Sequence, residues 1–406
     1  MNSMSVPLLR RSLFGVALTL VSGLASAQMT YRLTELGTLG GSWSSGSAIN
    51  DDGYVTGASE TDQITQCYDN AGVLYCQYEI HAFLWNGDVI VDVGTLGGHN
   101  SHGNTINKKG QVVGDSDTDP SGTHAFLYTN GSLASLGTID GNYSFGRAVN
   151  DLGQVVGGTT YLPFGSALHA FLYTNGSMID LDPGTGYDSQ ALAINKKGQV
   201  MITSRDRIFL FSGGVTTDIG TLGGASTIGR GINASGQMTG WSDTTGLPHA
   251  FLYSRGKLKD LGTLGGTYSE GNAINDAGQV AGTSYTADGL KHAFLYSKGL
   301  MKDLGTLGGQ QSEGLALNGV GEVTGSSATG AVQHAFLYTG GQMLDLNDLV
   351  DPNSPLKAYV RLATGIAITD TGYILAVGTN SQTGTERAYV LKKIVQCVPT
   401  GRRLCN

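Results

Sequence analysis

The sequence repeats the phrase His-Ala-Phe-Leu-Tyr along almost its whole length, and this repetition constrains the fold more than any other feature. The phrase occupies 124–128, 169–173, 249–253, 292–296 and 334–338, and it ends in Trp at 81–85. Weaker copies stand at 207–211 and 387–391. Eight copies, about 43 residues apart, predict a single repeat array instead of two or three independent domains.

Two further phrases recur in a fixed order around the first. Gly-Thr-Leu-Gly-Gly begins at 37, 94, 220, 262 and 305, and Ile-Asn-x-x-Gly-Gln-Val occupies 106–112, 194–200 and 274–280. Asn suits the first position of a tight turn, and Gly supplies its left-handed residue. The 63 glycines of the 406-residue chain are therefore assigned to turns. Each unit is predicted to form four short antiparallel strands, a to d.

Units of this kind are typical of propeller blades, so we predict an all-β, eight-bladed β-propeller of four-stranded antiparallel blades. Unit eight lacks strand d, whereas residues 31–37 form a strand d without a unit. We expect the N-terminal strand to pair with 386–391 and close the ring, which also protects exposed strand edges. An open β-repeat solenoid is the alternative architecture.

The first 27 residues are typical of a secretory signal peptide. Arg10 and Arg11 precede an apolar run from Leu13 to Leu24, and Ala25-Ser26-Ala27 has the form of a cleavage site. An uncleaved membrane anchor is the alternative, but the run is short for a span. The expected domains are thus a signal peptide (1–27), one propeller (28–395) and a C-terminal tail (396–406). The mature chain is expected outside the cell or in a periplasm.

The net charge limits which partners the chain can bind, and the cysteines bear on disulfide formation. Loss of the leader removes two arginines and no acids, which takes the formal charge from −8 to −10. An acidic chain without a basic stripe excludes nucleic acid as a natural partner, and no later stretch is expected to span a membrane. Export favours two local disulfides, Cys67–Cys76 and Cys397–Cys405. Zinc is the rival interpretation, but no histidine has ligand spacing to either pair.

The succession of His-Ala-Phe-Leu-Tyr and Asp-Leu-Gly-Thr-Leu-Gly-Gly resembles the bacterial HAF family of extracellular repeat proteins. The resemblance covers almost all of the mature chain. Units four and eight depart from it, with Arg207 and Arg387 in place of His, and unit three has Leu181-Asp182-Pro183-Gly184 in place of the glycine phrase. The family implies an exported repeat protein and supplies no activity, substrate or catalytic residue.

Repetition separates scaffold residues from candidate site residues. The histidines of the repeated phrase are expected to be structural, because they lie one blade apart and Arg, a hydrogen-bond donor but not a metal ligand, replaces two of them. Alternating strands place the a–b and c–d turns on one face and the variable b–c and d–a links on the other. Variable loops on a rigid frame commonly carry function, so the second face is the candidate.

The d–a links lead into the innermost strands, so their side chains are expected at the mouth of the central channel. The candidate catalytic residues there are His99, His102, Tyr143 and Arg147. The candidate ligand-binding residues are Trp43, Tyr187, Arg230, Tyr268, Glu270 and Glu313. Aromatic rings stack on sugars, and charged groups hydrogen-bond hydroxyls, which favours a glycan or another polar ligand. A polar rim without a ligand is the alternative.

Two b–c links have unusual chemistry. The longest, about 60–80 in unit one, carries Cys67 and Cys76 and is expected beside the two histidines, either as a pocket wall or as a stapled surface insertion. The second contains Asp115, Asp117 and Asp119, whose alternation resembles the start of a calcium loop. That pattern is incomplete, because Pro120 replaces the usual Gly and no Glu closes it. A solvated acidic loop is the alternative, and no other cofactor is indicated.

Three functions remain open from the sequence. The first is a non-catalytic secreted module that presents variable loops to a glycan or an extracellular protein. The second is a polysaccharide lyase, with His or Tyr as base and Arg neutralising a carboxylate, or a glycoside hydrolase that uses Glu270 and Glu313. The third is a structural envelope or matrix component. No familiar catalytic phrase is present, and the sequence leaves the oligomeric state open.

Overall fold

The computed structural model describes residues 29–70, 73–119, 122–161 and 167–394. Residues 30–394 form one compact unit. The predicted signal peptide and the Cys397–Cys405 pair lie outside the described residues.

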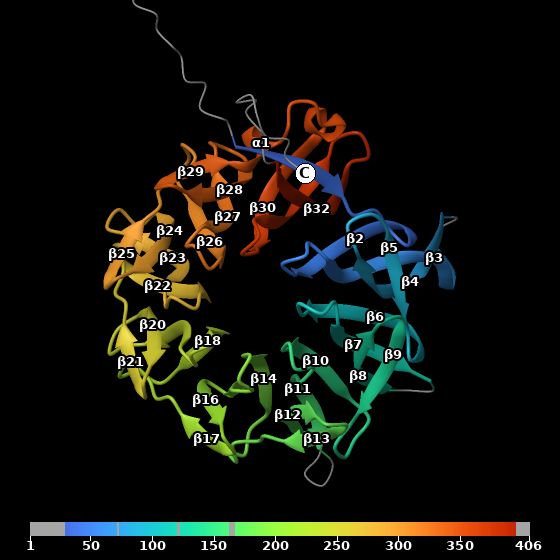
Figure 1. The fold of residues 1–406 in the computed structure, drawn as a ribbon, viewed down its shortest axis with the longest axis horizontal. Helices are drawn as coiled ribbons and strands as arrows, with labels where there is room; N and C mark the ends of the chain where they lie inside the picture. Colours follow the sequence, from blue (N-terminus) through green and yellow to red (C-terminus); the bar gives the residue numbers. More distant parts are fainter. Residues whose placement is uncertain (1–28, 71–72, 120–121, 162–166, 395–406) are drawn as a thin grey trace, which may run out of the picture. The chain divides into compact units, whose positions relative to one another are not determined.

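The described chain forms eight four-stranded antiparallel sheets arranged around a common axis, each with its strand a innermost (Figure 1). The predicted β-propeller is thus confirmed. Blades one to four are β2 (Gly40–Ile49), β3 (Val55–Asn70), β4 (Val73–Trp85), β5 (Ile90–Gly94); β6 (Gly97–Ile106), β7 (Val112–Thr118), β8 (Gly122–Thr129), β9 (Ser132–Gly137); β10 (Ser144–Val149), β11 (Val155–Tyr161), β12 (Ala167–Thr174), β13 (Ser177–Asp180); and β14 (Ser189–Ile194), β15 (Val200–Ser204), β16 (Arg207–Ser212), β17 (Val215–Asp218).

Blades five to eight complete the ring. They are β18 (Thr227–Ile232), β19 (Met238–Asp243), β20 (Pro248–Ser254), β21 (Lys257–Asp260); β22 (Gly265–Ile274), β23 (Val280–Thr286), β24 (Lys291–Ser297), β25 (Leu300–Asp303); β26 (Ser312–Leu317), β27 (Val323–Ala328), β28 (Gln333–Thr339), β29 (Gln342–Asp345); and β30 (Val360–Ile368), β31 (Tyr373–Asn380), β32 (Thr385–Ile394) with β1 (Thr30–Glu35).

The ring closes as predicted. Strand β1 pairs antiparallel with β32, with Glu35 opposite Tyr389 and Leu33 opposite Leu391. The first and last parts of the described chain thereby share one blade (Figure 1). Closure pairs the outer edge of β32, which would otherwise expose unpaired backbone groups.

The apolar core lies between neighbouring blades. One buried cluster joins Val55 and Phe83 of blade one to Leu375 and Val390 of blade eight. Strands b and c supply most of these side chains, which explains the repeated Val and Phe. Each blade covers one face of the next, so the stability of the ring comes chiefly from blade-to-blade burial.

Close packing of the inner strands requires glycine. A Cβ on Gly282 in strand b of blade six would lie 2.0 Å from the carbonyl oxygen of Glu270 in strand a. A Cβ on Gly271 would lie 2.2 Å from Oγ1 of Thr239 in blade five. The register shifts immediately after Gly271, which marks a β-bulge on the inner strand. The same shift recurs in the inner strands of the other blades.

A ring of amide hydrogen bonds, the asparagine belt, links the a–b turns of successive blades. In each of the first seven blades the turn Asn donates from Nδ2 to the backbone carbonyl of the equivalent residue in the next blade, over 2.9–3.3 Å. Its members are Asn50, Asn107, Asn150, Asn195, Asn233, Asn275 and Asn318. Blade eight has Thr369 instead, and there Thr371 Oγ1 donates to the carbonyl of Asp51 at 2.6 Å. The repeated Asn is thus a connector between blades.

The link into blade eight departs from the repeat. It carries α1 (Leu346–Leu349), whose N-cap Asp345 accepts a hydrogen bond from the Asn347 backbone, and the short 3₁₀ helix η1 (Pro355–Ala358). Asn347 also exchanges hydrogen bonds of 2.8 and 3.0 Å with the backbone of Leu362. This side chain therefore substitutes for a strand neighbour where β30 begins.

Candidate functional site

The repeated histidines brace strands c and d of their own blades. Five of them place Nδ1 within 2.6–2.9 Å of an Asp carboxylate eleven residues later, in strand d of the same blade. His124 is the exception: its partner is the hydroxyl of Ser135 at 2.9 Å, and burial lowers the pKa of this histidine. Where Arg replaces His, Arg207 pairs with Asp218 at 2.7 Å and Arg387 with Glu35 at 3.0 Å. This matches the expected structural, hydrogen-bonding role.

The candidate residues of blades five to seven converge on one cavity. It has a volume of about 810 Å³ and is lined by Arg230, Tyr268, Glu270 and Glu313 of the predicted set. Leu247 from the b–c link and Thr267 near the start of the inner strand β22 line the same cavity, so the b–c link and the entry to the inner strand share one face, as predicted. We call this cavity the blade-six cavity.

Ion pairs and a tyrosine organise the blade-six cavity. Arg230 Nε lies 2.6 Å from Oε1 of Glu270, and the Tyr268 hydroxyl donates to Oε2 of the same carboxylate at 2.7 Å. Lys291 pairs with Glu313. The Tyr268 ring meets Tyr285 edge-on, with centroids 6.0 Å apart. Both carboxylates and both cations are therefore neutralised locally before any ligand arrives.

Tyr268 is a hydrogen-bond donor in this cavity and not a base. Burial, and then the hydrogen bond to the Glu270 carboxylate, raise the pKa of Tyr268 well above its ordinary value. Its phenol therefore stays protonated at physiological pH.

The paired candidates His99 and His102 do not form one site. They lie three residues apart on β6, and a strand sends residues at odd separations to opposite faces. His99 Nδ1 lies 2.8 Å from Oε1 of Glu79 in blade one, whereas His102 Nδ1 lies 3.7 Å from Oδ2 of Asp115 in blade two. The nearby Asp115 carboxylate raises the pKa of His102 despite the partial burial of the imidazole.

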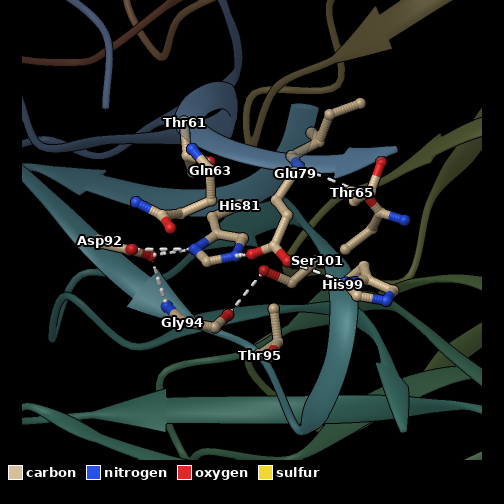
Figure 2. Close-up of polar contacts among 12 residues, drawn as sticks. Thr61, Gln63, Thr65, Glu79, His81, Asp92, Gly94, Thr95, His99 and Ser101 are labelled. Atoms are coloured by element: carbon tan, nitrogen blue, oxygen red, sulfur yellow. Dashed lines mark hydrogen bonds and ion pairs between the residues drawn. The ribbon is translucent and has the colours of Figure 1, made fainter. Parts of the chain in front are cut away.

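Glu79 joins two histidines in a chain of polar contacts (Figure 2). One oxygen faces His99, and the other lies 3.3 Å from Nε2 of His81, whose Nδ1 lies 2.8 Å from Asp92. The hydrogen bond with Asp92 is the main cause that raises the pKa of His81. Burial alone would raise the pKa of Asp92, but hydrogen bonds from His81 and the Gly94 amide lower it.

The remaining candidates are scattered around the ring. Trp43 lies in a separate cavity of about 240 Å³ beside Arg387, at the junction of blades one and eight. Tyr187 receives a hydrogen bond of 2.7 Å from Arg205, whose guanidinium carbon lies 4.4 Å from the ring centroid. Tyr143 and Arg147 are exposed on blade three. Arg147 and Arg230 occupy the same bulge position in their inner strands.

The three aspartates of the predicted calcium loop lie on and just after a strand. Asp115 and Asp117 belong to β7, and each accepts a side-chain amide hydrogen bond, from Asn104 at 2.9 Å and Asn100 at 3.0 Å. Asp119 is exposed in the following turn. Within the described ranges, no cluster of three His, Cys, Asp or Glu residues is placed to hold a metal ion. Asp115 and Asp117 therefore take part in hydrogen bonds within their own blade.

The long link of blade one is a β-ribbon and not a loop. Strands β3 and β4 continue past the blade and pair as far as Asn70 and Val73. The predicted disulfide joins Cys67 to Cys76 across this ribbon. The ribbon meets blade two through Glu79 and His99, as the sequence led us to expect for the link and that histidine.

Sequence reasoning missed three features. Lys291 and Tyr285 line the blade-six cavity but were not singled out, although Lys291 precedes the repeated His at a position that varies between units. Glu79, which stands two residues before the repeated His81, was not singled out either. The third feature is a cavity of about 440 Å³ on the opposite, a–b turn face, where Asp51, Lys108 and Lys196 surround the axis. The repeated turn phrase predicts only short tight turns on that face and gives no sign of a charged cavity there.

No family model and no curated protein matches the sequence. Among the described residues, no helix has the length and apolarity to cross a bilayer.

Solved structures with similar folds share little sequence with the chain. The β-propeller domain of the Trilobed protease from Pyrococcus furiosus aligns with 77% of this chain and 99% of its own, at 10% identity and a TM-score of 0.46. Dipeptidyl peptidase 4 from Porphyromonas gingivalis aligns with 80% of this chain, at 12% identity and a TM-score of 0.43, and the alignment covers 55% of the peptidase. YCF48 bound to D1 peptide aligns with 90% of this chain and 96% of its own, at 11% identity and a TM-score of 0.41.

Proposed function

We propose that this protein is an exported binding module and that the blade-six cavity is its ligand site. The observation that carries the proposal is the convergence of Arg230, Tyr268, Glu270 and Glu313 on one cavity. The positions that these residues occupy vary from blade to blade, whereas the residues that hold the blades together repeat. The volume of the blade-six cavity lies within the ordinary range of small-ligand sites, a few hundred to about 1,000 Å³.

The ligand is an uncharged, hydroxyl-rich molecule, namely a neutral oligosaccharide. Tyr268 and Tyr285 provide rings for the apolar faces of sugars, and the charged pairs provide donors and acceptors for hydroxyls. A charged ligand would have to break the Arg230–Glu270 or Lys291–Glu313 pair and leave one member uncompensated. A neutral sugar can hydrogen-bond to both pairs while they stay intact.

Export is supported by the Cys67–Cys76 disulfide, which persists in oxidising compartments. The leader-like residues 1–27 and the resemblance to HAF repeat proteins point the same way. The binding surface would then face glycans of an envelope or matrix.

A carbohydrate-active enzyme is the second candidate, and the Glu79–His99 contact favours it. A carboxylate on Nδ1 orients an imidazole so that Nε2 is presented outward, which is the arrangement of a general base. The His99 side chain is 67% exposed. Against it, none of the other candidate catalytic residues contacts this pair among the contacts found in the described chain.

A glycan array probed with the purified exported chain tests the proposal. We expect binding to neutral oligosaccharides, at least a tenfold loss in Tyr268→Ala, and little change in Tyr143→Ala, an exposed tyrosine outside the cavity. Circular dichroism checks that both variants fold. Binding that survives Tyr268→Ala, or binding restricted to uronate-containing glycans, would contradict the site or its ligand class. Release of reducing ends or unsaturated products, lost in His99→Ala, would favour the enzyme.

A further inference from the structure

We infer that the ribbon of blade one is a second binding surface, which takes an extended, cationic segment of a partner protein by strand addition. This ribbon comprises residues 62–70 and 73–80 and lies far from the blade-six cavity in the chain. The inference rests on the ribbon's own edges, exposed side chains and charge, so it stands or falls independently of the proposed function.

The ribbon offers free strand edges. Pairing of β2 with β3 ends at Thr61, and pairing of β5 with β4 begins at Ala82. Between these points β3 and β4 pair as strands only with each other in the described part of the chain, and at the base of the ribbon the Ile80 backbone N–H donates to Asn100 Oδ1 at 3.2 Å. The Cα atoms of Cys67 and Cys76 lie 4.1 Å apart, which is the narrow type of antiparallel pair, whose backbone N–H and C=O groups point outward. Such edges pair readily with an added strand.

The ribbon is held in place before any partner arrives. The disulfide pins its strands, and the side chains of Gln66 and Gln77 bond across them at 2.9 Å. At its base, Glu79 contacts His99 of blade two, as Figure 2 shows. A two-stranded ribbon alone is only marginally stable in water. These restraints reduce the ordering cost of binding, which is the usual reason that preorganised surfaces bind more tightly.

Large apolar side chains are exposed on this ribbon. Ile64, Tyr68 and Tyr78 are 52%, 51% and 38% exposed. Ile64 and Tyr78 stand directly opposite each other in the register, so they share one face. Alternate side chains of an added strand would pack on this face, and the Tyr78 ring would accept a cationic group.

Charge identifies the kind of partner. No Lys or Arg occurs between Arg32 and Lys108, whereas this stretch carries nine acidic residues. They are Glu35, Asp51, Asp52, Glu60, Asp62, Asp69, Glu79, Asp88 and Asp92. A second copy of the same ribbon would bring acidic surfaces together, which opposes self-pairing. A lysine- or arginine-bearing strand is complementary to this sector.

Two synthetic peptides separate strand addition from simple charge attraction. One is a capped heptapeptide of alternating lysine and valine, and the other alternates lysine and proline, with the same charge but without alternate backbone N–H groups. We expect the Lys-Val peptide to bind the full exported chain at least tenfold more tightly, by fluorescence anisotropy. Hydrogen exchange of the unmodified chain should slow within residues 62–80 only with the Lys-Val peptide.

Substitution of the ribbon provides the second arm. Ile64→Lys with Tyr78→Lys should abolish the difference between the peptides, whereas the matched control Val215→Lys with Leu300→Lys, also exposed, should retain it. Equal affinity for both peptides, or protection outside the ribbon, would overturn the inference. So would a concentration-dependent dimer that the ribbon variant abolishes, because the occupant would then be a second copy. None of these outcomes depends on glycan binding or on Tyr268.

Discussion

Asn275 provides the sharpest test of how the blades are joined. Its side chain is buried and makes four hydrogen bonds. Oδ1 accepts from the backbone of Ala277 at 3.1 Å and of Gln279 at 3.0 Å, while Nδ2 donates to the Gln279 side chain at 2.8 Å and to the Asn318 carbonyl at 3.0 Å. Three of these bonds stabilise its own turn, and the fourth crosses to blade seven.

Replacement of Asn275 by Ala removes all four bonds. At a net ~1 kcal/mol each, with partial compensation by water at the turn, we expect a loss of about 3 kcal/mol in the free energy of unfolding. An unfolding entropy of roughly 2.1 cal/mol/K per residue over residues 30–394 gives ~0.8 kcal/mol/K, so Tm should fall by about 4 °C. Differential scanning calorimetry measures this shift directly.

Asn275→Asp separates the two halves of the interaction. The carboxylate retains both acceptors but turns an oxygen toward the Asn318 carbonyl and the Gln279 oxygen, so it should destabilise at least as much as Ala. Asn142→Ala, at an exposed position, is the control and should change Tm by less than about 1 °C. A wild-type Tm in Asn275→Asp would refute the role of the amide donor, and with it the asparagine belt as a connector.

Three further predictions concern single side chains. Gly282→Ala should lower the free energy of unfolding by more than about 4 kcal/mol or prevent soluble expression, because the new Cβ would lie 2.0 Å from the Glu270 carbonyl oxygen. The control Gly246→Ala, whose Cβ would have its nearest atom at 3.6 Å, should leave the melting temperature unchanged. Tyr389→Phe should stabilise the fold by about 1–2 kcal/mol in urea unfolding, because the buried Tyr389 hydroxyl has no hydrogen-bond partner among the described residues. Burial also raises the pKa of this hydroxyl to about 12. An unchanged urea midpoint would contradict the prediction. The ion pair of His81 with Asp92 should contribute fully to the free energy of unfolding below about pH 6.5, and this contribution should disappear as the pH rises through the raised pKa of the folded state. The Tm difference between the unmodified chain and His81→Gln should therefore shrink between pH 5 and pH 9. A Tm difference that grows with pH would contradict this reasoning.

The architecture could be predicted from the residues alone, because the repeat carries its own turn and strand signals. The eight copies of strand c, the Asn and Gly of the turns and the displaced strand d near Tyr31 were enough to predict eight blades and a ring closed by β1. The replacement of His by Arg207 and Arg387 likewise indicated a hydrogen-bonding role. Local preferences and regular spacing are properties of the chain itself, so they can be read without coordinates.

Which candidate residues come together could be seen only in the folded ring. The channel mouth was predicted as one ring of side chains, but Arg230, Tyr268, Glu270 and Glu313 share a cavity while Trp43 and Tyr187 lie elsewhere. The sequence also suggested that His99 and His102 act together, whereas the strand directs them to different carboxylates. The physical reason is that convergence depends on blade twist, on the inner-strand bulge and on which ion pairs form across blades. These contacts join residues about 40 positions apart, and no local pattern in the sequence records them.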